Sequence, residues 1–185
     1  MSGFASLRMA VSAALIGLAL VSPHAGVVAP AAAAQVGTVG PSGLPLPRFV
    51  SLKAAKVNSR IGPGVNYPVD WLYLKPGLPM EVIQEYDNWR RVRDSDGAEG
   101  WINQQLLSGH RTAIAAPWQR GKPAKINLLA NPEAGARTVA IIEPGVIGSI
   151  KQCNGEWCEM SFAGTSGWVS QSQLWGAYPG ESVEN

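Results

Sequence analysis

The chain has few residues of the kinds that most catalytic sites need. Its 185 residues include two cysteines and two histidines, and the formal net charge is only +2. Such a small excess of positive charge argues against nucleic acid as a partner and against electrostatic attachment to a membrane surface. The sequence also lacks a Gly-x-Ser-x-Gly elbow and a phosphate-binding glycine loop. The common arrangements of nucleophile and base are therefore incomplete, and no enzyme is predicted.

Long apolar runs are also scarce. Arg8 precedes the apolar run from Met9 to Val21, and a tract of small residues ends at Ala34. Because a bilayer span needs about 20 apolar residues, we interpret residues 1–34 as a secretory signal peptide that is cleaved after Ala34. A retained anchor is the alternative. No later segment is apolar enough to be a transmembrane segment, and no cysteine stands directly after the run to carry a lipid. The mature protein is therefore expected to be exported.

Both cysteines, Cys153 and Cys158, lie in the part expected to be exported, where disulfides persist. They flank the tetrapeptide Asn154 to Trp157. If this tetrapeptide is a hairpin loop, the two cysteines face each other across two strands at a separation that a disulfide can bridge. A metal site is the alternative, but no histidine or third cysteine stands near enough to complete one. We predict a disulfide, and neither a metal nor another cofactor.

The remaining chain divides by composition. Residues 35–48 are rich in Pro and Gly, which predicts an extended, unpacked linker; docking of Leu44 to Pro47 as a polyproline strand is the alternative. From Phe49 onward, short β-rich runs alternate with turn residues and no window has a long 3.6-residue apolar period, which predicts an all-β sandwich or barrel. In the first half, strands are expected near residues 49–52, 57–59, 69–74, 80–84, 89–93 and 100–102.

An internal repeat organises this β-rich region. Residues 89–102 and 157–169 each begin with Trp, continue through a glycine-rich turn and end in a Gly-Trp pair followed by a β-branched residue. Other matches at a nearly constant offset are Lys56, Asn58, Pro63, Pro76 and Gln84 with Lys125, Asn127, Pro132, Pro144 and Gln152. We predict two copies of one small barrel, at 49–109 and 110–176, followed by a tail at 177–185. A unit of about 60 residues is marginal alone, so the copies are expected to pack together.

The first copy resembles bacterial Src-homology-3-like (SH3b) domains. Val57 to Pro68 contains an Asn and an Arg before a Gly-Pro loop, and Trp89, Val92 and Gly100-Trp101-Ile102 are similar to the closing half of such domains. The second copy keeps the Trp and Gly-Trp positions but has Leu129 in place of Arg60. The resemblance implies two tandem SH3-like β-barrels in a periplasmic or secreted bacterial protein. Relatives that bind proline-rich ligands have a Pro and an aromatic residue where this chain has Asn103 and Leu106.

The ligand-binding candidates are mostly aromatic, because large rigid rings supply contact area. They are Trp89, Arg60, Tyr67, Trp101 and Trp157. Packing within the barrel is the alternative role for the tryptophans. Because Trp89 and Val92 are three apart on one strand, they point to opposite faces, which predicts Val92 and Ile102 in the core and Trp89 on the ligand-facing side.

The arginines have two interpretations. Arg60 with Arg90, Arg91 and Arg93 is suited to clamp a carboxylate or phosphate, or these residues form a solvated face that nearby acids balance. For function, the resemblance implies a non-enzymatic module that binds cell-wall peptidoglycan or its stem peptides. The alternative is a periplasmic adaptor that binds a segment of another envelope protein. A glycoside-cleaving acid pair such as Asp87 and Glu99 is the enzymatic alternative.

Overall fold

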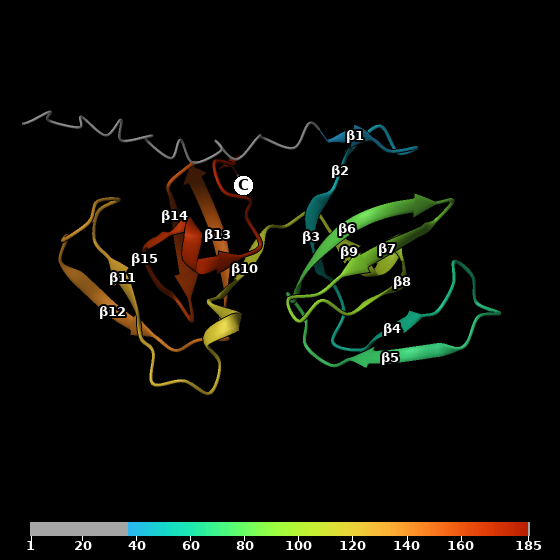
Figure 1. Ribbon diagram of the computed structural model, residues 1–185, viewed down its shortest axis with the longest axis horizontal. Coiled ribbons are helices and arrows are strands. Elements are labelled where there is room, and N and C mark those ends of the chain that lie inside the picture. Colours follow the sequence, from blue (N-terminus) through green and yellow to red (C-terminus); the bar gives the residue numbers. More distant parts are fainter. Residues whose placement is uncertain (1–36, 185) are drawn as a thin grey trace, which may run out of the picture. The chain divides into compact units, whose positions relative to one another are not determined.

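The computed structural model describes residues 37–184, so the signal peptide predicted at residues 1–34 lies outside the described residues. The predicted all-β class is confirmed, with 3-10 turns as the only helical elements in the described range (Figure 1). Within this range no helix has the length and apolar character needed to span a bilayer. The elements are β1 (Thr38–Val39), β2 (Pro45–Leu46), β3 (Arg48–Leu52), β4 (Val57–Arg60), β5 (Val69–Tyr73), β6 (Pro79–Tyr86), β7 (Trp89–Arg93), β8 (Glu99–Asn103), η1 (Gln104–Leu106), β9 (Leu107–Ser108), β10 (Thr112–Ala115), η2 (Pro117–Gln119), β11 (Ile126–Leu129), β12 (Thr138–Ile142), β13 (Ile147–Asn154), β14 (Trp157–Phe162), β15 (Thr165–Ser170), η3 (Gln171–Gln173), β16 (Leu174–Trp175) and β17 (Ser182–Glu184).

The two copies of the sequence repeat form two sheets with the same strand order. The first barrel, β3 to β9, has the order β5-β4-β8-β7-β6-β3-β9, and the second barrel, β10 to β17, has the order β12-β11-β15-β14-β13-β10-β16. In the first barrel one residue pair joins β4 to β8, and in the second barrel one residue pair joins β11 to β15. Arg60 pairs with Trp101 in the first barrel, and Leu129 pairs with Trp168 in the second. The tandem arrangement expected from the repeat is therefore confirmed at the level of register.

The six strands expected in the first copy are present, with ends that differ by at most two residues. Short β-rich runs separated by turn residues made them visible in the sequence. Register shifts fall at matching places in the two barrels, between Ser59 and Arg60 and between Leu128 and Leu129. Such bulges bend a strand and increase its twist, which helps a short sheet to curl on itself.

The Gly of each Gly-Trp pair permits a close approach between strands. A Cβ at Gly100 would collide with the Ser59 hydroxyl, and a Cβ at Gly167 would lie 2.7 Å from the Leu129 carbonyl oxygen. Ser59 and Leu129 belong to β4 and β11, the strands that pair with β8 and β15. Glycine is therefore needed at both positions so that the two halves of each sheet can meet.

Each barrel has its own apolar core. In the first barrel, Val92 and Ile102 are fully buried beside Val57, Met80 and Val82, as the sequence predicted for the first two. In the second barrel the core consists of Ala113, Ala115, Ala116, Ile126, Leu128, Ile142, Ile150, Cys153, Cys158, Met160, Phe162, Val169, Leu174, Ala177 and Val183.

The N-terminal strap, residues 37–47, differs from the extended linker that its composition suggested. β1 and β2 pair with each other, and Leu46 packs against the core of the first barrel. The backbone amide and hydroxyl of Ser42 donate to the two Glu85 carboxylate oxygens at 2.9 and 2.8 Å. The composition of the strap does not record this packing, because the residue that fixes the strap, Glu85, lies more than 40 residues away in the sequence.

The C-terminal segment also belongs to the folded unit. Residues 182–184, within the segment expected to be a tail, form β17 and pair with β13. Val183 is buried in the second core, and Glu181 accepts hydrogen bonds from Arg111 at 2.8 and 3.0 Å. The second barrel therefore has one more strand than the first.

The two barrels contact each other through an inter-barrel interface whose aromatic part consists of Phe49, Trp175 and Tyr178, with Glu81 beside it. The Phe49 ring centroid lies 5.3 Å from that of Trp175 and 4.7 Å from that of Tyr178. The Tyr178 hydroxyl donates to Glu81 at 2.9 Å. Burial, followed by the proximity of Glu81, raises the pKa of Tyr178, so its hydroxyl keeps its proton. The expected packing of the two copies is confirmed.

Candidate binding grooves

The first barrel has a groove beside Trp89, hereafter the first groove. Its volume is about 330 Å³. It is lined by Lys56, Asn58, Arg60, Val65, Trp89, Asn103, Gln105 and Leu106. The sequence singled out Trp89 and Arg60, and the fold brings them together although they are far apart in the chain. Reasoning from the sequence did not predict Lys56, Gln105 or Val65 as groove residues.

Strand alternation explains how these side chains reach the groove. In β4, Val57 and Ser59 are buried, so Asn58 and Arg60 face outward. Trp89 stands directly opposite Asn103 across β7 and β8. The side-chain oxygen of Asn103 accepts a hydrogen bond from the backbone amide of Gln105 at 3.1 Å, which fixes the start of η1. The groove is therefore built on strands and on one tightly held turn.

Arg60 also organises the loop next to the groove. Its guanidinium donates to the Tyr67 carbonyl at 2.6 Å. A Cβ at Gly62 would collide with the Tyr67 ring, so the Gly-Pro loop folds closely under this aromatic residue. Tyr67 itself is not among the groove-lining residues. Its place in the structure is to shape the loop that carries Val65.

The charge of the first groove is one-sided. Lys56 and Arg60 are cationic, Asn58, Asn103 and Gln105 offer amide groups, and none of the described residues lining the groove is acidic. Arginine and lysine recognise carboxylates by charge-assisted hydrogen bonds, and an aromatic side chain adds apolar contact area. The arrangement suits an extended ligand that carries a carboxylate.

The other arginines of this region pair with acids of the same barrel. Arg90 is buried and lies 3.1 Å from Glu85, Arg91 lies 2.8 Å from Glu99, and Arg93 makes two hydrogen bonds to Glu81 at 2.9 and 2.7 Å. These contacts separate Arg60 from the rest of the predicted clamp. The three residues balance the nearby acids, which was the second of the two interpretations.

Trp101, a ligand-binding candidate from the sequence, lies elsewhere. It is half-buried on β8, where it pairs with Arg60 on one side and Arg91 on the other. It does not line the first groove. The structure therefore separates Trp89 from Trp101, although both were candidates on the same physical argument.

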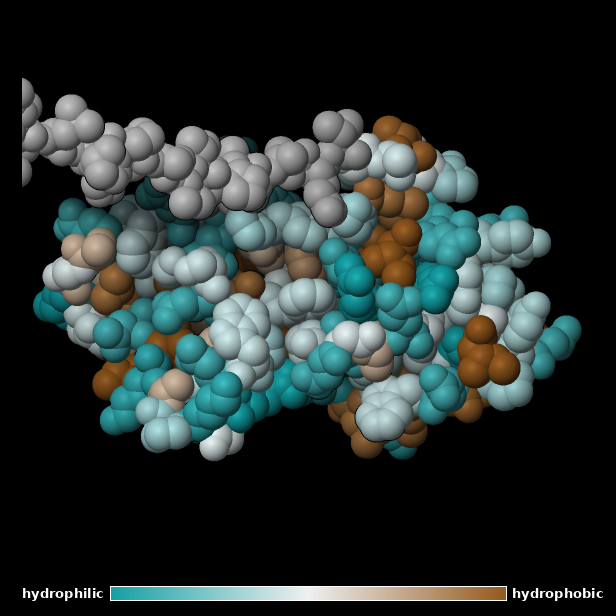
Figure 2. Space-filling model, viewed as in Figure 1, coloured by the Kyte–Doolittle hydropathy of each residue, from teal (hydrophilic) through white to brown (hydrophobic). Residues whose placement is uncertain are grey.

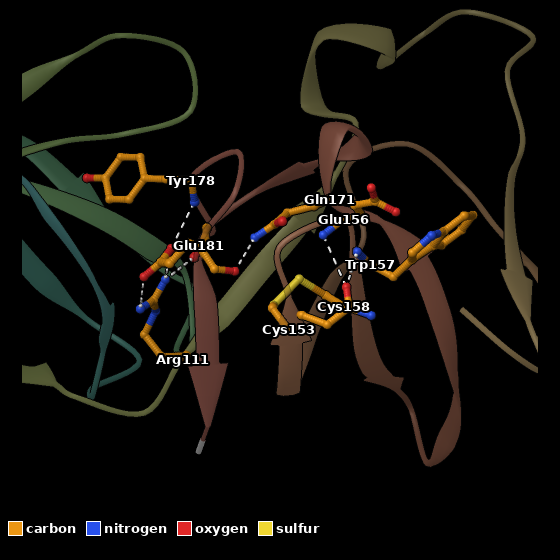
Figure 3. The surroundings of a disulfide bond; sticks show 10 residues. Arg111, Cys153, Glu156, Trp157, Cys158, Gln171, Tyr178 and Glu181 are labelled. Carbon is orange, nitrogen blue, oxygen red and sulfur yellow. Dashed lines mark hydrogen bonds and ion pairs between the residues drawn. A yellow bond between two sulfur atoms is a disulfide. The ribbon is translucent and has the colours of Figure 1, made fainter. Parts of the chain in front are cut away.

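The second barrel has a second groove, of about 360 Å³, beside the disulfide. The disulfide is as predicted: Cys153 faces Cys158 across β13 and β14, with 4.1 Å between the Cα atoms (Figure 3). The groove is lined by Gly155, Glu156, Trp157, Ser170, Gln171, Ser172, Pro179 and Gly180. Among these, the sequence identified Trp157. The C-terminal residues Pro179 and Gly180 were missed because nothing local shows that the chain returns to the turn.

These features define a class of protein with two small, curled antiparallel barrels that share one strand order. Each barrel has a groove beside the Trp that begins its fifth strand, β7 or β14. The sequence model of the bacterial SH3 domain family matches residues 53–109 and 122–176 of this chain. The chain therefore belongs to the bacterial SH3 domain family, as the sequence motifs indicated.

Distant neighbours among the solved structures include two proteins of one organism. NlpC2 from Trichomonas vaginalis aligns with a TM-score of 0.31 and 12% identity over 70% of this chain and 48% of that one. NlpC1 from Trichomonas vaginalis aligns with a TM-score of 0.30 and 11% identity over 76% of this chain and 49% of that one. This chain thus spans about half the length of each. No curated protein sequence matches it.

Proposed function

We propose that this protein is a non-catalytic, exported binding module of the bacterial cell envelope that binds peptidoglycan through carboxylate-bearing stem peptides in the first groove. Family membership and the disulfide support a periplasmic or secreted location. The observation that carries the proposal is the first groove itself, in which two cations and three amide side chains surround Trp89.

The chemistry of a stem peptide fits this groove. Such a peptide is short and extended, it has free carboxylates, and its alanine side chains allow close approach to an aromatic surface. Lys56 and Arg60 provide charge-assisted hydrogen bonds to the carboxylates, and the amides of Asn58 and Gln105 provide neutral partners for the peptide backbone. Trp89 supplies the apolar contact, as aromatic anchors do in other interfaces.

Co-sedimentation of the purified protein with cell-wall sacculi tests the proposal. We expect the wild-type protein to sediment, and Trp89→Ala and Arg60→Gln to lose at least about tenfold in affinity, which corresponds to roughly 1.4 kcal/mol. Trp118→Ala is the matched control, because Trp118 is 51% exposed and lies outside both grooves. Wild-type protein that stays in the supernatant contradicts the proposal.

A second measurement tests the role of the carboxylate. Isothermal titration with a stem tripeptide and with the same peptide amidated at its C-terminus should show weaker binding of the amide. Binding of the free acid should also weaken as the salt concentration is raised, because dissolved ions screen the attraction between exposed charges. The screening length is about 10 Å at 0.1 M salt. Equal affinities for the two peptides contradict the assignment of a carboxylate ligand.

An adaptor function is the second candidate, and the edge strand β5 favours it. Among the strands of residues 37–184, β5 has only β4 as a sheet neighbour, and it exposes Val69, Trp71 and Leu72, with Leu74 just beyond its end. Figure 2 shows apolar side chains gathered over this part of the first barrel. An open edge with apolar side chains can accept an extended segment of another envelope protein as an added strand.

Site-specific crosslinking in cells separates the two functions. A photocrosslinking amino acid that replaces Trp71 should capture one stoichiometric protein partner if the protein is an adaptor, whereas the same amino acid at position 118 should not. If the protein binds peptidoglycan alone, replacement at Trp71 yields no protein adduct and sacculus binding persists.

A further inference from the structure

The second groove includes one part that has no counterpart in the first barrel, the C-terminal loop. One wall is the turn between β13 and β14, and the other is the C-terminal loop at Pro179 and Gly180. The Gly180 amide donates to the Gly155 carbonyl at 3.2 Å, so the two walls are joined by a backbone hydrogen bond. The C-terminal loop is thus part of a binding groove.

A disulfide and several hydrogen bonds hold the walls of this groove together. The disulfide closes the β13–β14 hairpin, and the Asn154 side-chain oxygen accepts from the amides of Glu156 and Trp157 at 3.1 and 2.8 Å. The backbone amide of Gln171 in turn donates a hydrogen bond to the Glu156 backbone carbonyl at 2.8 Å. A preformed site loses little conformational entropy on binding. Figure 3 shows the Trp157 indole pointing away from the disulfide.

The side chains of the second groove differ in chemistry from those of the first. Trp157 and Pro179 offer apolar rings, and the hydroxyls of Ser170 and Ser172 lie 2.9 Å apart. Glu156 is exposed and brings a carboxylate. No cation is present among the described residues that line the groove. A carboxylate-bearing peptide therefore has no counter-charge here.

Gln171 gives a separate indication of the ligand. It is only 3% exposed, and its amide nitrogen donates to the Glu181 carbonyl at 2.9 Å, which fixes the amide plane (Figure 3). Within residues 37–184, its side-chain oxygen has no hydrogen-bond partner. A buried acceptor without a donor is unfavourable, so a ligand or a ligand-bound water that donates a hydrogen bond to this oxygen is favoured.

We propose that the second groove binds a neutral saccharide, with a pyranose ring against Trp157 and its hydroxyls bonded to Glu156 and the Ser170–Ser172 pair. Apolar C–H faces of a sugar suit an aromatic ring, and its hydroxyls donate to carboxylates and exchange bonds with hydroxyls. The inference rests on the proposed function, since a glycan strand is the other component of peptidoglycan. The two barrels then hold different parts of one polymer.

The test is a titration of the isotopically labelled, disulfide-intact protein with chitotetraose, followed by amide chemical shifts. We expect shifts confined to residues of the second groove, such as Glu156, Trp157 and Ser172. Trp157→Ala should weaken this binding by at least about tenfold. Trp118→Ala is the matched control and should bind chitotetraose like the wild type, because Trp118 lies outside both grooves. Glu156→Gln keeps an acceptor oxygen and should lose less than Trp157→Ala.

The outcomes distinguish this inference from the proposed function. If chitotetraose causes no shifts while wild-type protein still binds sacculi and Trp89→Ala does not, the saccharide site is wrong and the proposed function stands. If a lysine-containing stem peptide shifts the second-groove residues and chitotetraose does not, the ligand there is an ammonium group and the saccharide assignment is overturned. If chitotetraose binds but sacculus binding is unaffected by Trp89→Ala, the proposed role of the first groove fails instead.

Discussion

Glu85 and Arg90 face each other across β6 and β7 at the register position that Cys153 and Cys158 occupy across β13 and β14. The first barrel has an ion pair at this position, with 3.1 Å between Arg90 Nε and a Glu85 carboxylate oxygen, and the second barrel has a disulfide there. Glu85 also accepts from Arg48 at 2.7 Å and from Ser42, so the same carboxylate holds the N-terminal strap. The two barrels thus close the same hairpin by different chemistry.

We predict that Glu85→Gln destabilises the first barrel. Its carboxylate is 1% exposed and has two arginine partners, and breaking a buried ion pair by removing one partner costs roughly 3–5 kcal/mol. Equilibrium unfolding in urea measures the change. Glu99→Gln is the control, because the Glu99–Arg91 pair is more exposed and should contribute less than about 1 kcal/mol. Equal losses for the two variants would contradict this role of Glu85.

Stability should also depend on pH through Glu85. Burial by itself raises the pKa of Glu85, but the hydrogen bonds from Ser42 and the contact with Arg48 outweigh it and lower the pKa from 4.5 to about 2. Because the folded pKa is depressed, the stabilisation is complete above the unfolded value and is lost as the pH falls toward 2. The difference in unfolding free energy between wild type and Glu85→Gln should be constant above about pH 5 and shrink below it. A difference that does not change with pH would sink this prediction.

The disulfide should stabilise the second barrel by a modest amount. For so short a loop, the chain-entropy estimate is roughly 2 kcal/mol. The double variant Cys153→Ser with Cys158→Ser should unfold at a lower temperature than the wild type, and reductant should move the wild type toward the variant. The variant itself should not respond to reductant. Wild-type protein that is indifferent to reductant would show that the bond contributes nothing.

The inter-barrel interface should make the two barrels unfold together. Phe49 is 5% exposed and contacts Trp175 and Tyr178, so Phe49→Ala should cost roughly 3–5 kcal/mol and separate the unfolding into two transitions in calorimetry. Leu52→Ala is the control, since Leu52 is buried within the first core. It should destabilise the protein without comparable uncoupling. One undivided transition in Phe49→Ala would contradict the coupling.

The Gly-Trp pair gives a further prediction. Gly100→Ala places a methyl group against the Ser59 side chain and should cost roughly 1–3 kcal/mol, because overpacking displaces a strand. Gly109→Ala is the control, since nothing lies within 4 Å of its added Cβ. Thermal unfolding of both variants measures the difference. Unchanged stability of Gly100→Ala would show that β4 and β8 can move apart without cost.

Local patterns were enough to predict the repeat, the strands and the disulfide. Alternation placed Val92 and Ile102 in the core, and the short spacing of Cys153 and Cys158 placed them opposite each other. The resemblance of the first copy to bacterial SH3 domains likewise depended on residues close in the sequence. Strand alternation and hairpin register extend over a few residues, so the sequence by itself determined these features.

The tertiary structure decided which candidates share a site. Arg60 joins Trp89 in one groove with Lys56 and Gln105, whereas Trp101 lies outside it and Tyr67 supports a loop. The strap was expected to be unpacked because its partner, Glu85, is distant in sequence. Pro179 and Gly180 became part of the second groove for the same reason. These contacts depend on chain closure over long separations, which no local pattern of residues records.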